Sequence, residues 1–313
     1  MKRNRDGSLL RPLLTGFLAG LFLTLGVVLA VVYMKGGFTG ASLRKSTTNQ
    51  ETPSAYGRVG YPEAETMDRA PAGTDSAKRS GDRLNETDHR PTIALVIDDF
   101  GNQWDTEAVQ GLLHWDHPLT VAVIPGLWAS ERCARKALEQ GKEVILHLPM
   151  EPEDDEAPVE TFMLRRGMGR EDVETLLARG LTTVPGATGL NNHQGSAATA
   201  DTTAMTALAE AAGARGWYLL DSVTSPKTVM RAMAEQWGIP AMSRDIFLDH
   251  TDDPDTIRAA LRKAIERAKR TGGPVVVIGH PRRTTWNVLR ETIQPGDHDI
   301  RWVTLSEAIG KPG

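Results

Sequence analysis

Residues 91–310 alternate between short apolar runs and longer amphipathic segments. Apolar runs of strand length occur at residues 93–97, 119–124, 143–146, 187–190, 217–220, 239–242, 275–278 and 302–305. Several are apolar throughout, as in strands that are buried on both faces of a parallel sheet. Between them, the spacing of apolar residues predicts helices at 129–140, 170–182, 202–215, 227–237 and 255–270. This alternation predicts one α/β domain, either a barrel or an open doubly wound sheet.

The chain begins with a short basic segment, residues 1–11, which an uncharged apolar segment follows. Residues 12–34 are 23 residues without a charge, and about 20 apolar residues are enough to cross a bilayer. The apolar region exceeds the roughly 7–15 residues of a cleavable signal core, and no clear A-x-A site follows it. We therefore expect an uncleaved transmembrane anchor rather than a signal peptide, with the basic segment in the cytoplasm.

Residues 35–90 differ in composition from the segments on either side. They are rich in Thr, Ser, Gly, Pro and charged residues and contain few aliphatic ones. Such a segment cannot bury enough apolar surface to offset the entropy lost on ordering. We expect a flexible linker that holds the following domain away from the membrane.

Charge and cysteine usage exclude several classes of protein. The 313 residues include 36 Lys and Arg against 40 Asp and Glu, for a formal charge of −4. A nucleic-acid-binding protein would normally carry a strongly basic face or tail. The single cysteine, Cys133, excludes an intramolecular disulfide and a Cys-rich zinc site. The sequence has no Walker A motif, no G-x-G-x-x-G turn and no G-x-S-x-G elbow, so nothing indicates nucleotide binding or a serine nucleophile.

Carboxylates, imidazoles and amides follow six of the predicted strands at the point where each strand ends. They occur in Asp98-Asp99, HLPMEP (147–152), NNHQGS (191–196), Asp221-Ser222, Arg244-Asp245 and GHP (279–281). In parallel α/β folds the carboxyl ends of the strands meet at one edge, and ligands bind there. The sequence therefore predicts a functional site at this edge.

The residue types in these segments are those of a metal site with acid–base groups. Asp98 and Asp99 crowd negative charge after a buried strand unless a cation or a proton relieves it, although a lone Asp often caps a helix. His147, Glu151 and His193 would add nitrogen and oxygen ligands that suit zinc or another divalent transition metal. The alternative for His147 is a histidine buried in the core. His280 could donate a proton at such a site, or it could bond only to backbone.

The motifs IDDFG, HLPMEP, NNHQGS, LLDS and GHP, in this order, resemble the divergent polysaccharide deacetylase family, distant relatives of the NodB-type carbohydrate esterases. The resemblance covers residues 91–309, nearly the whole predicted domain, and the combination of motifs is more specific than any one of them. It implies a bacterial protein with an irregular (β/α) barrel of about seven strands, related to the TIM barrel.

The resemblance also implies roles for the residues at the strand ends. Asp98 matches the general base, Asp99 a metal ligand, and His280 the general acid. The family motif H-x-x-x-H-P places two histidines on the metal. In this chain His147 matches the first, and Glu151 stands where the second would be.

His193, after the next strand, would then supply the missing imidazole. Asn192 and Asp221 are candidates for binding the substrate. The implied cofactor is a divalent metal, with zinc favoured.

Together these expectations describe a single-pass protein of the bacterial inner membrane with its catalytic domain (residues 91–310) in the periplasm. The expected activity is metal-dependent removal of acetyl groups from an N-acetylated envelope polysaccharide or glycan. One alternative is a catalytically inactive glycan-binding or scaffolding module on the same barrel. Another is a metal-dependent hydrolase of a different bond, such as an ester or a phosphoester.

Overall fold

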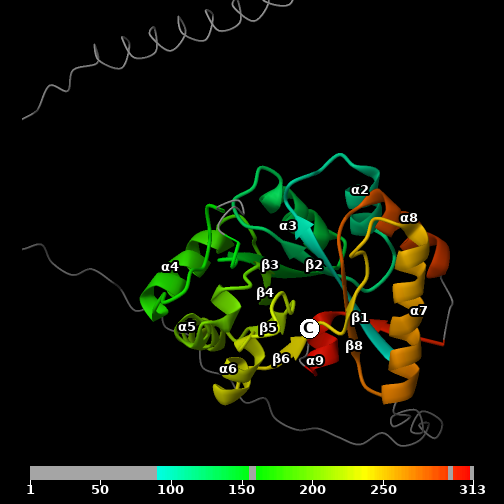
Figure 1. The fold of residues 1–313 in the computed structure, drawn as a ribbon. Coiled ribbons are helices and arrows are strands. Elements are labelled where there is room, and N and C mark those ends of the chain that lie inside the picture. The colour runs from blue at the N-terminus through cyan, green and yellow to red at the C-terminus, as the bar shows by residue number, and fades with distance from the viewer. Residues whose placement is uncertain (1–89, 155–159, 295–298, 311–313) are drawn as a thin grey trace, which may run out of the picture. The chain divides into compact units, whose positions relative to one another are not determined.

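The computed structural model describes residues 90–154, 160–294 and 299–310 (Figure 1). The predicted anchor at 12–34 and nearly all of the predicted linker at 35–90 lie outside the described residues. Within the described ranges, no helix combines the length and the apolar composition that crossing a membrane requires.

A parallel sheet of nine strands forms the centre of the domain (Figure 1). Eight strands follow one another in the order β6-β5-β4-β3-β2-β1-β8-β7, and β9 pairs with the first part of β1. In the described part of the chain, the end strands β6 and β7 do not pair, so the sheet forms an incomplete barrel. The strands are β1 (Thr92–Phe100), β2 (Thr120–Val123), β3 (Glu143–Met150), β4 (Gly189–Gln194), β5 (Tyr218–Asp221), β6 (Ala241–Ser243), β7 (Ile246–Phe247), β8 (Val275–Gly279) and β9 (Arg301–Val303).

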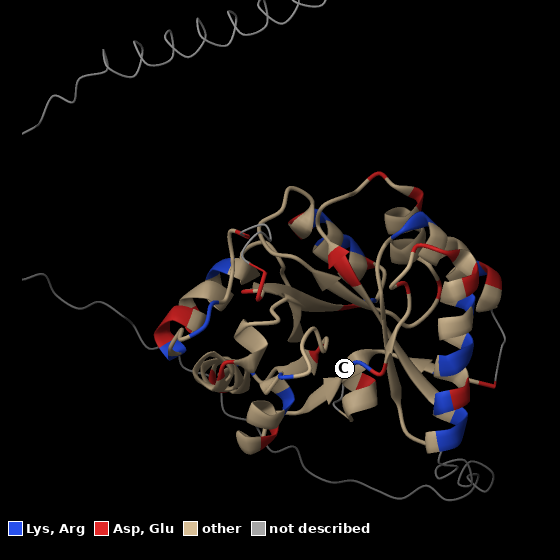
Figure 2. Ribbon diagram, in the orientation of Figure 1, with Lys and Arg blue, Asp and Glu red and all other residues tan. Residues whose placement is uncertain are grey.

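Helices connect the strands, and all of those described except α9 pack on the outer face of the sheet. Figure 2 shows charged residues concentrated on the helices, most plainly along α7. Local signals set several helix ends. The carboxylate of Asp201 accepts from the Ala204 amide at the start of α5, and Gly272 ends α7 with φ +68°. The helices are α2 (Glu107–His114), α3 (Ser130–Glu139), α4 (Arg170–Leu181), the 3₁₀ turn η1 (Ala198–Ala200), α5 (Thr202–Ala214), α6 (Met230–Gln236), α7 (Pro254–Thr271), α8 (Arg283–Thr292) and α9 (Leu305–Ile309).

Apolar side chains fill both sides of the sheet. Along β1, Ile93, Leu95 and Ile97 belong to the core between the sheet and the helices, because alternate residues of a strand point to opposite faces. Ala94 and Val96 point to the inner face, where they join a smaller cluster with residues of β2, β3, β5, β8 and α9. The inner face is therefore apolar along the first part of the strands.

The predicted α/β class with a parallel sheet is confirmed, and so are the five predicted helices within a few residues. Three of the strands reach at least three residues further than their apolar runs indicate, and β1 extends to Phe100. β3 extends to Met150 and β4 to Gln194, so His147 and the segment Asn191–His193 lie within strands.

Candidate metal centre and active site

The inner face of the sheet changes from apolar to polar at the carboxyl ends of the strands. On four strands a polar residue lies two positions beyond a buried apolar residue of the inner face. Side chains on one face of a strand recur every second residue, so each polar side chain points to the same face as the apolar one before it. The pairs are Val96 and Asp98 on β1, Ile145 and His147 on β3, Leu220 and Ser222 at the end of β5, and Ile278 and His280 at the end of β8. All four polar residues line one pocket, of about 390 Å³, which we call the site pocket.

A distortion of β1 brings Asp99 to the same pocket. Neighbouring residues of a regular strand point to opposite faces, so Asp98 and Asp99 would normally diverge. The pairing of β1 with β2 shifts register between Ile97 and Phe100, and Asp99 has a left-handed backbone with φ +60°. Such a bulge turns a side chain away from its regular direction. Both carboxylates consequently line the site pocket.

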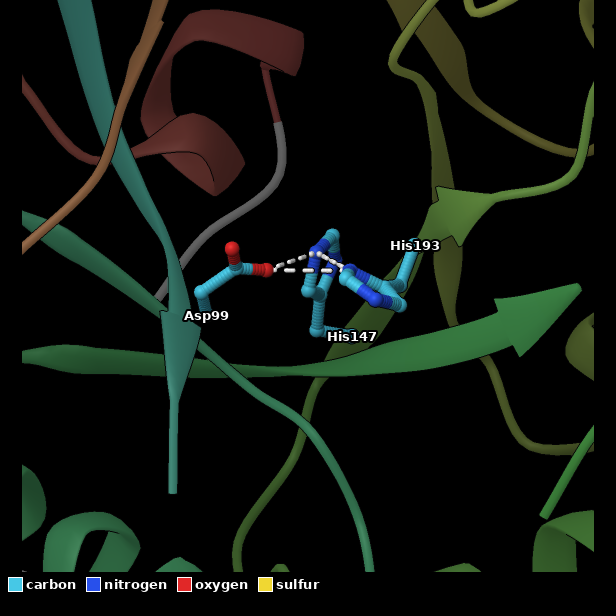
Figure 3. A group of neighbouring side chains, drawn as sticks. All are labelled: Asp99, His147 and His193. Atoms are coloured by element: carbon cyan, nitrogen blue, oxygen red, sulfur yellow. Dashed lines mark hydrogen bonds and ion pairs between the residues drawn. The ribbon is translucent and has the colours of Figure 1, made fainter. Parts of the chain in front are cut away.

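Asp99, His147 and His193 form a compact cluster (Figure 3). Oδ1 of Asp99 lies 3.1 Å from Nε2 of His147 and 3.0 Å from Nδ1 of His193, and the two ring nitrogens are 3.2 Å apart. All three ligand atoms lie within 4.8 Å of one another. One carboxylate and two imidazoles converging in this way fit the donor set of a divalent cation such as zinc. The cluster could therefore hold a metal ion.

Asn191 connects this cluster to Asp98. Its Oδ1 lies 2.8 Å from Nδ1 of His147, and its Nδ2 donates a 2.8 Å hydrogen bond to Oδ1 of Asp98. Because an amide oxygen only accepts, Nδ1 of His147 carries a proton, and Nε2 is the ring nitrogen that faces Asp99 and can bind a metal ion. A fixed tautomer of this kind orients a histidine for metal binding.

Asp98 is buried, with 3% of its surface exposed. Burial raises the pKa of its carboxyl group above the usual value, and the neighbouring charge of Asp99 raises it further. The positive charge that His147 and His280 can carry acts in the opposite direction and does not cancel the effect. A carboxylate with a raised pKa holds a proton more readily than an exposed one, which suits a general base.

His280 faces the cluster from the other side of the pocket and is held from behind by Asp249. Its Nδ1 lies 2.8 Å from Oδ1 of Asp249, and its backbone amide donates to Oδ2 of the same carboxylate. Nε2 of His280 points toward the pocket and lies 3.7 Å from Oδ2 of Asp99. Burial alone would lower the pKa of His280, but the hydrogen bond and the charge of Asp249 outweigh it and raise the pKa. His280 is thus placed to carry a proton into the pocket.

Comparison with known proteins identifies the family. Residues 95–309 match the model of the divergent polysaccharide deacetylases. The chain belongs to the divergent polysaccharide deacetylase family. This confirms the resemblance that the motifs indicate.

The chain is also similar to curated relatives and, in fold, to a solved structure. The chain is 34% identical over 220 residues to the uncharacterized protein YibQ of Escherichia coli (strain K12), covering 70% of this chain and 68% of that one. It is 32% identical over 213 residues to an uncharacterized protein of Haemophilus influenzae, covering 68% and 75%. The crystal structure of the uncharacterized protein ATU2773 from Agrobacterium tumefaciens C58 has a TM-score of 0.63 at 21% identity, covering 70% of this chain and 89% of that one.

In this member of the divergent polysaccharide deacetylase family, the structure does not bring Glu151 to the metal-ligand cluster. The Glu151 carboxylate accepts from the backbone amide of Arg166 at 2.8 Å and pairs with its guanidinium at 2.7 Å. Glu151 follows the last residue of β3, so its direction is set by the loop against which it packs and not by the strand. The cluster unites three of the four predicted ligands, Asp99, His147 and His193.

The two predicted substrate-binding residues occupy different positions. Asn192 lines the site pocket, but its amide holds the protein's own loops, accepting from Ser222 N and donating to Gln194 O and Thr224 Oγ1. Asp221 is buried behind the pocket, where it accepts from the backbone amide of Val223 at 2.8 Å. It braces a loop in which Val223 has the uncommon φ of +52°.

Three residues of the candidate site have contacts that sequence reasoning did not foresee. Asn191 is not of a residue type that commonly binds zinc, and its hydrogen bonds become apparent only when β1, β3 and β4 are placed together. From the sequence alone, Asp249 could equally be a helix cap or an ion-pair partner. Arg244 lines the pocket while donating to the carbonyls of Ser222 and Val223. The only signal for all three was their position at or beyond strand ends.

Proposed function

We propose that this chain is a metal-dependent hydrolase that removes acetyl groups from an N-acetylated glycan of the bacterial envelope. Family membership supports the reaction class. The observation that carries the proposal is that a metal-ligand cluster, a buried carboxylate with a raised pKa and a carboxylate-held histidine converge on one pocket. This combination suits metal-dependent amide hydrolysis, in which one group takes a proton from water and another gives one to the leaving amine.

Asp99, His147 and His193 would hold the metal, and we propose zinc. When bound, such a cation polarises the scissile carbonyl and lowers the pKa of water. The protein's contribution is to hold the three ligands. His147 is kept in one tautomer by Asn191, and Asp99 is turned inward by the bulge in β1.

Asp98 accepts the proton of the attacking water. Its Oδ1 is occupied by the Asn191 amide, so Oδ2, 3.7 Å from Nε2 of His147, is the oxygen next to the cluster. His280 donates a proton from Nε2 to the departing amine. Asp249 keeps the other nitrogen of that ring protonated and directed away from the pocket.

We place the domain in the periplasm, anchored to the inner membrane by residues 12–34. The supporting observation is the uncharged apolar segment preceded by basic residues. This location would give the domain access to envelope glycans.

A non-catalytic glycan-binding role would not require the buried Asp98 or the pairing of His280 with Asp249.

The test is acetate release by the full-length chain. The protein is stripped with chelator, reloaded with zinc, and incubated with N-acetylated oligosaccharides of chitin and of peptidoglycan. We expect release with zinc, loss of at least a hundredfold in Asp98→Asn and His280→Gln, and no change in His114→Gln, an exposed histidine on α2. Zinc-loaded protein that releases no acetate from either glycan, or an active Asp98→Asn variant, would refute the proposal.

A further inference from the structure

A second groove lies beside the loops that follow β1 and β2. Its walls are Trp104 from the first loop, Trp128 from the second, and side chains of α3 that include Arg132, Arg135 and Lys136. Its volume is about 840 Å³, larger than that of the site pocket. We call it the tryptophan groove. None of its lining residues lines the site pocket.

Trp128 is unusually exposed for an aromatic side chain. It is 69% exposed, compared with 47% for Trp237 and 41% for Leu138, the other large apolar side chains that are exposed in the described part of the chain. Its ring is nevertheless held in place, because Nε1 donates a 2.8 Å hydrogen bond to the carbonyl oxygen of Asn102. A fixed aromatic face in solvent is a ready stacking surface, since a ligand that covers it loses little conformational entropy in the protein.

Among the described residues, one cationic side chain of the groove has no carboxylate partner. Arg135 pairs with Glu131 at 2.8 Å, and Lys136 lies 3.5 Å from Glu139. The guanidinium of Arg132 lies over the ring of Trp104, 5.1 Å from its centre, and has no carboxylate partner among residues 90–154, 160–294 and 299–310. The groove thus offers an exposed aromatic face and an excess positive charge within a single hollow.

One end of the groove, formed by Trp104 and Trp128, lies at the same end of the sheet as the metal-ligand cluster, and its other wall runs along α3 to Glu139. Asp99 belongs to β1, and Trp104 follows it by five residues, a length of chain that spans at most about 18 Å. The loop between them is docked on the next loop through Trp128 and through the Ala129 amide, which donates to the carbonyl of Gly101. A short oligosaccharide reaching into the site pocket could therefore extend over the tryptophan groove.

We propose that the tryptophan groove binds sugar residues of an acidic glycan at a distance from the reacting acetyl group. Sugar rings stack on Trp128, and a carboxylate on the glycan pairs with Arg132. This inference rests on the proposed function, because its occupant is the same polymer whose acetyl groups enter the site pocket. It adds that the enzyme binds a chain of several sugars and favours one that carries negative charge.

The experiment measures binding rather than turnover. Calorimetry is performed on the full-length, zinc-loaded chain carrying Asp98→Asn, so that no acetyl group is removed during the titration. Three probes are used: the chitin disaccharide, the uncharged chitin hexasaccharide, and a hexasaccharide of alternating N-acetylglucosamine and glucuronic acid. We expect the acidic hexasaccharide to bind most tightly.

Substitutions in the groove should separate stacking from charge. Trp128→Ala should weaken both hexasaccharides about tenfold and leave the disaccharide unchanged, while Trp128→Phe, which keeps an aromatic face, retains most of the affinity. Arg132→Gln should weaken only the acidic hexasaccharide, about fivefold. Trp237→Ala, at the second most exposed tryptophan, is the matched control and should change nothing.

Several results would overturn the inference. Equal affinities of Trp128→Ala and Trp237→Ala would show that the groove takes no sugar. Equal losses in Trp128→Ala and Trp128→Phe, or a parallel loss for the disaccharide, would show that Trp128 acts only by holding the Asn102 loop. If the wild-type chain releases no acetate but binds hexasaccharides through Trp128, the hydrolase proposal fails and the groove stands. If the wild-type chain releases acetate but its hexasaccharide binding does not depend on Trp128, only the proposal for the groove fails.

Discussion

The side-chain amide of Asn191 donates a 2.8 Å hydrogen bond to Oδ1 of Asp98, and both residues are buried. The same amide accepts from Nδ1 of His147 through its oxygen. One side chain therefore orients both the proposed base and a metal ligand. Its two contacts can be tested separately, because one uses the amide nitrogen and the other uses the oxygen.

Asn191→Ala should weaken zinc binding and lower activity. The change leaves Nδ1 of His147 and the Asp98 carboxylate without a buried partner, and loss of such supporting contacts typically costs 10–100-fold in metal affinity. Asn191→Asp keeps an acceptor for His147 but sets a second carboxylate against Asp98. We expect it to retain zinc and lose acetate release. Zinc affinity is measured by competition with a chelating dye, and wild-type affinity in Asn191→Ala would contradict this role.

Zinc should stabilise the folded protein through three residues and not four. A ligand that binds only the native state adds about 4 kcal/mol at a concentration 1,000 times its Kd, which raises the midpoint of thermal unfolding. This rise should disappear in Asp99→Ala and His193→Ala and persist in Glu151→Gln, because the Glu151 carboxylate binds Arg166. Unfolding is followed by circular dichroism with and without zinc. Loss of the rise in Glu151→Gln would place Glu151 among the ligands.

Asp249→Asn should impair turnover without releasing the metal. Asp249 accepts from the ring and the backbone of His280 and also from Thr285 Oγ1 at 2.7 Å. An amide at this position can donate to Nδ1 of His280, which favours the neutral ring with its proton on Nε2. The amide also lacks the negative charge that stabilises the protonated, cationic ring. We expect at least a hundredfold loss of kcat with unchanged zinc affinity. Thr285→Val, which removes one neutral donor, should cost about 1 kcal/mol of stability and little activity.

Cys133 should react with thiol reagents only when the domain unfolds. It is buried in α3, and burial raises the pKa of its thiol to about 11. The thiolate is the reactive form, so a raised pKa leaves very little of it at pH 8 in the folded state, whereas an unfolded thiol has a pKa near 8.5. Iodoacetamide labelling at pH 8, followed by mass spectrometry, should rise along the denaturant unfolding curve. Rapid labelling of native protein would contradict the buried position.

The positions of the site residues in the sequence predicted much of the site. Asp98, His147, His193 and His280 all follow apolar runs in the sequence, and a parallel sheet brings the carboxyl ends of such runs to one edge. The inner-face periodicity even sets their direction, since three of them lie two positions beyond a buried inner-face residue. For Asp99 the same periodicity fails. Only the register shift in β1 and its left-handed backbone turn this carboxylate inward.

The sequence by itself determined the α/β class, the family and the edge of the sheet that carries the chemistry, because apolar periodicity and motif order are local properties of the chain. Tertiary structure alone decided which polar groups meet. Glu151 stands in a ligand position of the motif yet binds Arg166, while Asn191 and Asp249, which no motif marks as ligands, hold His147 and His280. These contacts join residues at least 15 positions apart, so they depend on strand register and loop packing, which the local pattern does not specify.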